Sequence, residues 1–267
     1  MAPRLAPLAS FQDGENLSTM RQAQFLLLCC LLLAGPLVAA SDADAAASEE
    51  PPDPRSSELH GVERLDALLA HIRQRQSQLE TMEASFVQRK ESSMLLEPSE
   101  ARGVFSYAAP DRVRWEYETP DPISLLIADD EMTTWYRDLE KAEKAFIGRQ
   151  SQKVLEYLGA GSSLDDLIKY FDVAMAVPGD RSEPFRLEMK PRYARIAKRL
   201  TSMKIWIDPA LYLPIGLRYV EPDGDVTDYR FMDLRINDLL PDERFELELP
   251  GEVEVSVVEL EGRSSRR

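Results

Sequence analysis

Residues 103–120 read GVFSYAAPDRVRWEYETP, a stretch in which large apolar side chains alternate with small or charged ones. The large apolar residues are Phe105, Tyr107, Val113, Trp115 and Tyr117. A period of two on both sides of a proline turn predicts a β-hairpin with one buried face and one charged face. Nothing on the buried face suggests catalysis. We interpret this face as a wall that either packs against other side chains or encloses a ligand.

Strand patterns continue on both sides of this hairpin, and a helix precedes them. Ser57 is the N-cap candidate, and apolar residues recur at three- and four-residue steps from Val62 to Leu79. The strand candidates are 82–90, 103–108, 112–118, 122–128, 132–137, 143–147, 171–177, 184–190, 201–208, 214–221, 225–234, 244–249 and 253–258. So many consecutive strands with short turns predict a mainly-β fold, an unclosed antiparallel barrel of about 11 strands.

Two short helices are predicted between the strands at 143–147 and 171–177. Residues 150–158 and 163–170 have helical spacing and are separated by a break rich in glycine and serine. Their apolar positions include Leu155, Leu158, Leu164 and Leu167. Helices in this place could cover the sheet or cap its mouth.

The first 40 residues have the features of a secretory signal peptide. An uncharged run, residues 25–38, follows Arg21 and leads to small residues ending at Ala40. This run is short for a transmembrane helix, so cleavage near Ala40 is favoured over an uncleaved anchor. Met20 is an alternative start, because the stretch before Arg21 is long and polar for a signal.

The remainder of the chain is predicted to hold one domain. Residues 41–57 consist mainly of alanine, aspartate, glutamate and proline, and they are expected to form a disordered tether. The domain is expected over residues 58–260, which is long enough for a sizeable core, with a disordered tail at 261–267.

Charge and cysteine content limit the classes of partner and of covalent modification. The formal net charge is −15 at pH 7, so we expect little general attraction to nucleic acid or to an anionic membrane. Cys29 and Cys30 both lie in the hydrophobic run, and Leu28 precedes them where bacterial lipidation needs a small residue. The exported chain is therefore expected to be neither lipidated nor disulfide-bonded.

Few residues are candidates for catalysis or metal binding. His60 and His71 lie about three turns apart on the predicted helix, too far for one metal, and both are expected to face solvent. The acidic pairs at 129–130 and 165–166 fall in a predicted turn and in the first turn of a helix, where a structural role suffices. The sequence contains no phosphate-binding loop or nucleophile elbow. We expect no enzyme activity, no cofactor and no metal.

One basic cluster stands out in this acidic chain. It comprises Lys190, Arg192, Arg195, Lys198 and Arg199. These residues are predicted to lie in a connection between two strands. They form either a docking patch for an acidic partner or lipid head group, or a solvated loop that offsets neighbouring acids.

A series of short motifs occurs along the chain in a characteristic order. The motifs are Ala84-Ser85-Phe86-Val87-Gln88, Gly103-Val104-Phe105, Pro110-Asp111-Arg112-Val113-Arg114-Trp115, Pro120, Ile127-Ala128-Asp129-Asp130, Trp135-Tyr136, Ile207-Asp208-Pro209, Leu213-Pro214, Phe231, Ile236-Asn237 and Phe245-Glu246-Leu247. Their order and spacing, behind a secretory signal, resemble the periplasmic outer-membrane lipoprotein carriers of the LolA type. The resemblance covers residues 62–255.

This resemblance implies an unclosed β-barrel with helices as a lid over an apolar cavity. It also implies a monomeric periplasmic carrier without a cofactor. Such a carrier would receive acylated lipoproteins from an ATP-driven transporter at the inner membrane and hand them to an outer-membrane acceptor. The implied acyl-chain-binding residues are Phe86, Phe105, Tyr107, Val113, Trp115, Tyr117, Ile205, Ile207, Leu217, Phe245 and Leu247. The implied lid residues are Leu155, Leu158, Leu164 and Leu167.

The chain departs from the family pattern in the hairpin turn. Many members carry an arginine just before the turn proline that holds the lid closed, and here that position is Ala109. Arg112 or Arg114 would have to substitute, or the lid would be gated differently. Two other functions remain compatible with the sequence: a carrier for another envelope lipid that serves a different exporter, and a lipoprotein-binding sensor domain.

Overall fold

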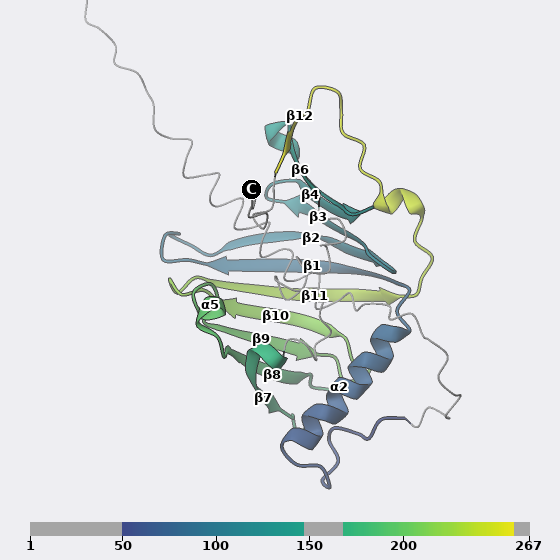
Figure 1. Ribbon diagram of the computed structural model, residues 1–267, viewed down its shortest axis with the longest axis vertical. Coiled ribbons are helices and arrows are strands. Elements are labelled where there is room, and N and C mark those ends of the chain that lie inside the picture. Colours follow the sequence, from purple (N-terminus) through teal and green to yellow (C-terminus); the bar gives the residue numbers. More distant parts are fainter. Residues whose placement is uncertain (1–49, 147–167, 259–267) are drawn as a thin grey trace, which may run out of the picture.

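The computed structural model describes residues 50–146 and 168–258, and nearly half of them form the strands of one twisted sheet (Figure 1). The strands are β1 (Thr81–Glu91), β2 (Ser99–Ala108), β3 (Arg112–Thr119), β4 (Ile123–Ala128), β5 (Glu131–Tyr136), β6 (Lys141–Phe146), β7 (Phe171–Ala176), β8 (Phe185–Pro191), β9 (Ser202–Ile207), β10 (Pro214–Val220), β11 (Val226–Ile236) and β12 (Glu254–Val257). Within the described residues their order is β12-β6-β5-β4-β3-β2-β1-β11-β10-β9-β8-β7, so β12 and β7 are the two edges of a 12-stranded unclosed sheet. The predicted mainly-β, unclosed barrel is thereby confirmed.

Two details of the predicted sheet are wrong. Neighbouring strands are antiparallel except at one edge, where β12 pairs with β6 in parallel. Residues 244–249 do not form a strand; instead a short 3₁₀ helix, η3 (Asp242–Phe245), is followed by extended chain. The chain between β11 and β12 leads from the end of β11 to the β6 edge of the sheet. It arrives beside the first residue of β6, so β12 runs along β6 in the same direction.

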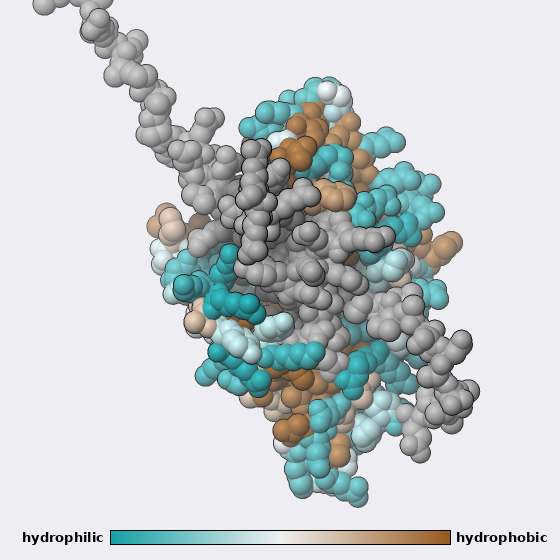
Figure 2. Space-filling view, viewed as in Figure 1, coloured by the Kyte–Doolittle hydropathy of each residue, from teal (hydrophilic) through white to brown (hydrophobic). Residues whose placement is uncertain are grey.

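The inner face of the sheet, defined here as the face that carries Phe86 and Trp115, is apolar, whereas the outer face is largely polar. Burial alternates along β3 and β9, as the period of two in the sequence predicts. Among the coloured atoms of Figure 2, hydrophilic residues predominate, with small hydrophobic patches between them. One face of each strand therefore supplies the core and the other meets solvent or the C-terminal segment.

Helix α2 (Val62–Ser77) packs its apolar stripe on the inner face. Leu68, Leu69 and Ile72 are almost completely buried in the same cluster as the inner-face strand residues. The N-cap is Gly61, not the predicted Ser57, and its positive φ of 50° suits glycine. The helix crosses the lower strands in Figure 1.

His71 is buried, which corrects the expectation that both helix histidines face solvent. Its ring stacks on Tyr212 with a centroid separation of 4.1 Å, and its Nε2 lies 3.3 Å from the carbonyl oxygen of Pro52. His60 is exposed, as expected. His71 is therefore buried by contacts with residues outside α2, and helical spacing alone could not predict its burial.

Residues 50–57, the described part of the expected tether, lie against the fold. The Arg55 guanidinium lies 4.0 Å from the centroid of the Phe185 ring, and its Nη2 donates to the carbonyl oxygens of Arg181 and Glu183. The predicted signal peptide and the tail at 261–267 lie outside the described residues. In the part of the chain that the structure describes, no helix is long and apolar enough to cross a membrane.

Candidate functional site

Nine of the eleven residues predicted to bind acyl chains share one buried cluster on the inner face. They are Phe86, Phe105, Tyr107, Val113, Trp115, Tyr117, Ile205, Ile207 and Leu217, each at most 6% exposed. One of them comes from the long central strand β1, which pairs with β11. The others come from β2 and β3 on one side of this central pair and from β9 and β10 on the other side. Strand alternation therefore gathers residues more than a hundred positions apart onto one apolar surface.

Trp115 is the centre of this surface and is 0% exposed. Phe86 and Phe105 meet its ring edge to face, with centroids at 4.8 Å and 4.9 Å. From β11, Tyr229 and Phe231 approach it at 5.8 Å each. Such aromatic pairs add to the stabilisation that comes from burial alone. The result is a continuous aromatic floor across β3, β2, β1 and β11.

Gly103 makes this floor possible. In the sheet register it lies between Phe86 on β1 and Tyr117 on β3, whose rings meet edge to face at 4.9 Å. A Cβ at Gly103 would overlap the carbonyl oxygen of Glu116 and would lie 2.9 Å from Cε1 of Phe86. The absence of a side chain therefore lets β2 and β3 approach closely and lets the Phe86 ring occupy the space.

The floor also contains residues that the sequence analysis did not select. Tyr229 and Phe231 are 3% and 6% exposed, and they alternate with Asp228 and Arg230 along β11. This alternation is the signal that could have identified them. Other members of the same cluster include Leu125, Ile127, Phe185, Leu187, Met189 and Met203.

The inner face is almost free of charge but carries phenol hydroxyls. The hydroxyl oxygens of Tyr117 and Tyr229 lie 3.4 Å apart, within reach of a weak hydrogen bond. Burial, with a smaller contribution from the charge of Asp111, raises the pKa of Tyr107 to about 12. The Tyr107 phenol is therefore neutral at physiological pH, and an apolar ligand beside it would not bury a charge at this position.

Phe245 and Leu247 do not join this cluster, although the sequence analysis placed them there. Phe245 packs with Ala108 and Leu126 in a second cluster, and Leu247 lies against it. Ala108 and Leu126 alternate with inner-face residues on β2 and β4, so the second cluster lies on the outer face. Because residues 244–249 are not a strand of the sheet, their alternation does not place them on the inner face.

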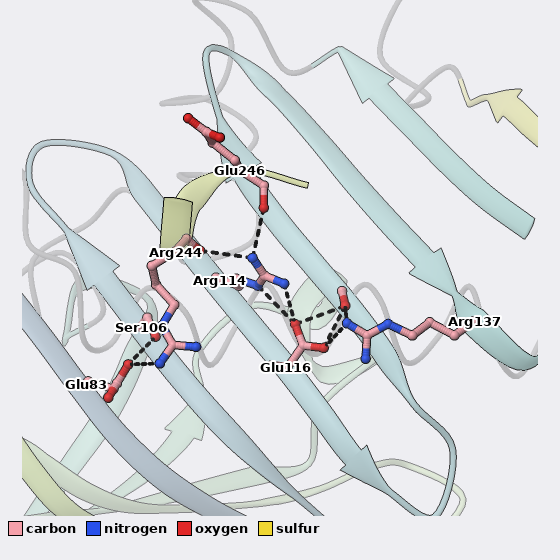
Figure 3. Close-up of polar contacts among 8 residues, drawn as sticks. Glu83, Ser106, Arg114, Glu116, Arg137, Arg244 and Glu246 are labelled. Atoms are coloured by element: carbon pink, nitrogen blue, oxygen red, sulfur yellow. Dashed lines mark hydrogen bonds and ion pairs between the residues drawn. The ribbon is translucent and has the colours of Figure 1, made fainter. Parts of the chain in front are cut away.

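A polar network fixes this C-terminal segment to the outer face (Figure 3). Arg114 donates to the carbonyl oxygens of Arg244 and Glu246 at 3.1 Å and 2.9 Å and forms an ion pair with Glu116. Glu116 also pairs with Arg137 from η1 (Arg137–Leu139). We call residues 241–247 the crossing segment, because they cross the outer face of β2, β3 and β4.

Glu83 anchors the same segment from β1. Its side chain is 5% exposed, forms ion pairs with Arg244 at 2.7 Å and with Arg235, and accepts a hydrogen bond from Ser106 at 3.2 Å. A carboxylate with this degree of burial requires such partners. The network therefore belongs to the outer face and has no member on the aromatic floor.

Arg112 and Arg114, the two candidates for an arginine latch, both act on the outer face. Arg112 pairs with Asp242 at 2.8 Å and lies over the Phe245 ring, while Arg114 binds the crossing segment. Neither side chain is directed to the inner face, where a lid would close. Lid residues Leu155, Leu158, Leu164 and Leu167 lie outside the described residues.

Four of the five residues of the basic cluster lie in the connection between β8 and β9, as predicted, whereas Lys190 lies near the end of β8. The short helix α5 (Ala194–Ala197) occupies this connection. All five basic residues, Lys190, Arg192, Arg195, Lys198 and Arg199, are exposed. Arg192 forms an ion pair with Asp172 at 2.8 Å.

Among the residues that the structure describes, one group of carboxylates is close enough to be considered for a metal. Ligand oxygens of Glu221, Asp223 and Asp225, in the β10–β11 turn, lie within 4.8 Å of one another. The ammonium group of Lys90 lies 3.8 Å from Asp225 and supplies positive charge there. The group is explained as an acidic turn beside a lysine, and we assign it no metal.

Solved structures of low sequence identity resemble this fold. An uncharacterized conserved protein from Thermus thermophilus is 12% identical, with a TM-score of 0.48 over 73% of this chain and 99% of that chain. MucB of Pseudomonas aeruginosa, solved with MucA, is 15% identical, with a TM-score of 0.43 over 73% of this chain and 62% of that chain. Lipoprotein LppX of Mycobacterium tuberculosis is 12% identical, with a TM-score of 0.38 over 66% and 98%.

Two comparisons were made with the amino-acid sequence of the chain. No curated protein sequence matches the chain significantly. The model of the family described as outer membrane lipoprotein carrier protein LolA matches residues 77–248. That range is well over half of the chain and includes strands β1 to β11, the aromatic floor and the crossing segment. The chain therefore belongs to the LolA family of outer membrane lipoprotein carrier proteins.

Proposed function

We propose that this protein is a periplasmic carrier that shields the acyl chains of lipoproteins on its inner face. In this proposal it acts as a monomer without a cofactor or catalytic step. It takes its cargo from an ATP-driven transporter of the inner membrane and delivers it to an acceptor at the outer membrane. The observation that carries the proposal is the aromatic floor around Trp115, supported by membership of the family.

The physical need for such a floor follows from the cost of exposing acyl chains to water. Transfer of each methylene group from an apolar environment to water costs about 0.8 kcal/mol. A chain of about sixteen carbons therefore costs on the order of 12 kcal/mol to expose. A soluble carrier has to offset most of this cost with apolar contacts. The inner face supplies aromatic and aliphatic side chains, and these fit an acyl chain.

The test is fluorescence quenching of Trp115 by a synthetic triacylated lipopeptide with brominated acyl chains. The chain has three tryptophans, and the sheet register places Trp135 and Trp206 on the outer face. A Trp135→Phe/Trp206→Phe variant therefore reports on Trp115 alone. We expect saturable quenching that an unbrominated lipopeptide reverses by competition.

The matched control is Trp115→Phe, which retains the two outer-face tryptophans and should show little quenching. Absence of quenching in the variant with Trp115 alone would exclude the inner face as the acyl-chain site. Mass spectrometry of the lipid that co-purifies with the exported protein then identifies the cargo. A triacylated lipoprotein supports the proposal, whereas phospholipid or a hopanoid indicates a carrier for another envelope lipid.

A further inference from the structure

The turn between β1 and β2 exposes three consecutive large apolar side chains. Met94 is 92% exposed, Leu95 44% and Leu96 105%. Exposed apolar residues are common as single residues on protein surfaces, but contiguous ones indicate an interaction site. Among the described residues, no other run of three large apolar side chains is exposed in this way.

The turn is ordered by its own hydrogen bonds. The Leu95 amide donates to the carbonyl oxygen of Ser92 at 3.1 Å, and the Met94 amide donates to Ser92 Oγ at 3.2 Å. The apolar side chains are therefore presented outward from the tip of a long hairpin. The strands just below the tip are exposed at Arg89 and Glu100, so the tip projects away from the core.

The connection between β8 and β9 presents positive charge and aromatic rings. Between Glu188 and Asp208 the sequence contains six basic residues and no acidic one. Arg195 lies 5.7 Å from the ring of Tyr193, which is 49% exposed. Within the described residues, Arg195, Lys198 and Arg199 have no carboxylate within ion-pair distance. Exposed arginine and lysine beside an exposed tyrosine suit the head-group region of a bilayer.

These two connections lie at the same end of the sheet. The β10–β11 turn separates them and contacts both sides: Lys90 at the base of the hairpin lies 3.8 Å from Asp225, and the Thr201 amide donates to Val220. In Figure 1 the β1–β2 hairpin tip, the β10–β11 turn and α5 follow one another along the left side. Figure 2 shows brown, hydrophobic atoms at this margin above a hydrophilic area. We call residues 92–98 and 190–199 together the docking rim.

We propose that the docking rim binds reversibly to the surface of an anionic phospholipid bilayer. The hairpin tip would insert Met94, Leu95 and Leu96 among the upper acyl groups, while the β8–β9 connection contacts lipid phosphates. Charge complementarity selects this partner, because a protein with a net charge of −15 is repelled by anionic lipid except where basic residues gather. The same repulsion would orient the protein with the docking rim toward the membrane. The acidic β10–β11 turn lies between the apolar tip and the basic loop, and Lys90 supplies positive charge beside Asp225. An apolar tip and a basic loop at the same end of the sheet fit a bilayer better than they fit an acidic protein, which would leave the tip uncovered.

The test is co-flotation of the exported full-length protein with vesicles of phosphatidylcholine containing about one third phosphatidylglycerol. We expect binding that weakens about tenfold on pure phosphatidylcholine vesicles and weakens further with added salt. Met94→Ser/Leu96→Ser and Arg195→Glu/Lys198→Glu should each reduce the partition coefficient about tenfold or more. All variants have the same N-terminal residues, so any contribution of these residues to vesicle binding is the same in every variant.

Matched controls lie at the opposite end of the strands. Leu239→Ser changes an equally exposed leucine after β11, and Arg181→Glu reverses an exposed arginine in the β7–β8 turn. Both should bind like the unaltered protein. Quenching of Trp115 by brominated lipopeptide should be unchanged in the docking-rim variants, and this separates the membrane contact from cargo binding.

Equal binding by the Met94→Ser/Leu96→Ser variant and the unaltered protein would overturn the proposal, as would equal binding to neutral and anionic vesicles. Binding to native inner-membrane vesicles but not to protein-free vesicles of the same lipids would assign the docking rim to a protein partner instead. That result would also overturn the proposal while leaving the carrier function untouched.

Discussion

Single residues decide how tightly the inner face is packed, and Gly103 has the least freedom. Replacement by alanine would drive a methyl group into the Glu116 carbonyl and toward Phe86. Because the obstacle is largely backbone, β2 and β3 would have to separate. We expect Gly103→Ala to lower the free energy of unfolding by about 2–3 kcal/mol, as measured by urea denaturation.

The control for this substitution is Gly179→Ala. A Cβ at Gly179 would meet no atom within 4 Å, so this variant should differ from the unaltered protein by less than about 0.5 kcal/mol. Equal effects of the two substitutions would show that the strands do not approach at Gly103 as described.

The buried phenol of Tyr107 makes stability depend on alkaline pH. Burial raises its pKa to about 12, whereas the unfolded chain loses this proton near pH 10. Between these values the folded state holds more protons than the unfolded state, so stability falls as the pH rises. The contribution is complete below about pH 10, and about 2 kcal/mol is lost by about pH 12.

Urea denaturation over this pH range checks the prediction, with Tyr107→Phe as the comparison. The phenylalanine variant cannot ionise at this position and should lose stability less steeply. Tyr136 does not obscure the comparison, because its burial also raises its pKa and it is present in both proteins. Parallel stability curves for the two proteins would refute the assignment to Tyr107.

At the scale of elements, the crossing segment depends on side chains from the sheet beneath it. The Arg114 side chain is 15% exposed, and it joins two carbonyl oxygens of this segment to Glu116. Truncation leaves the carbonyls without this donor and weakens the neutralisation of Glu116. We expect Arg114→Ala to cost about 2–4 kcal/mol and to increase hydrogen exchange in residues 241–247.

Arg218→Ala is the matched control for this prediction. Arg218 also projects from a strand and pairs with a carboxylate, Asp228, at 3.1 Å, but it is far more exposed and does not contact the crossing segment. We expect its loss to cost under about 1 kcal/mol. If hydrogen exchange in residues 241–247 is the same in both variants, Arg114 does not hold this segment.

The elements that the sequence predicted well are those whose period of two matched their burial. Tyr107, Trp115 and Tyr117 could be assigned to one apolar surface because each alternates with polar or small neighbours on a strand of the sheet. Phe245 and Leu247 alternate in the same way but belong to a segment that packs on the outer face. Local periodicity identifies a buried side, but it cannot tell which layer of the molecule buries it.

Contacts between residues that are remote in sequence account for the features that the sequence did not predict. The burial of His71 depends on Tyr212, which is remote in sequence, and the polar role of Arg114 depends on residues 244 and 246. The parallel pairing of β12 with β6 likewise follows from the path of the chain over the outer face. Spacing within a segment contains no information about these contacts. The order of family motifs did identify the fold, because it reflects the whole chain.

At the scale of the whole molecule, cargo binding and stability are linked, since a ligand that binds only the folded sheet stabilises it. A lipopeptide at about one hundred times its dissociation constant adds about 2.7 kcal/mol to the free energy of unfolding. For a domain of this size the expected rise in the thermal midpoint is about 5–10 °C.

The measurement compares delipidated and lipopeptide-loaded protein by differential scanning calorimetry. Trp115→Glu, which places a charge in the aromatic floor, should lose the cargo-dependent increase, because burial of an unpaired carboxylate beneath an acyl chain is unfavourable. Trp206→Glu, with its charge on the outer face, should retain the increase. If the folded Trp115→Glu variant showed the full increase, the cargo would have to bind away from the inner face, and the aromatic floor would be core alone.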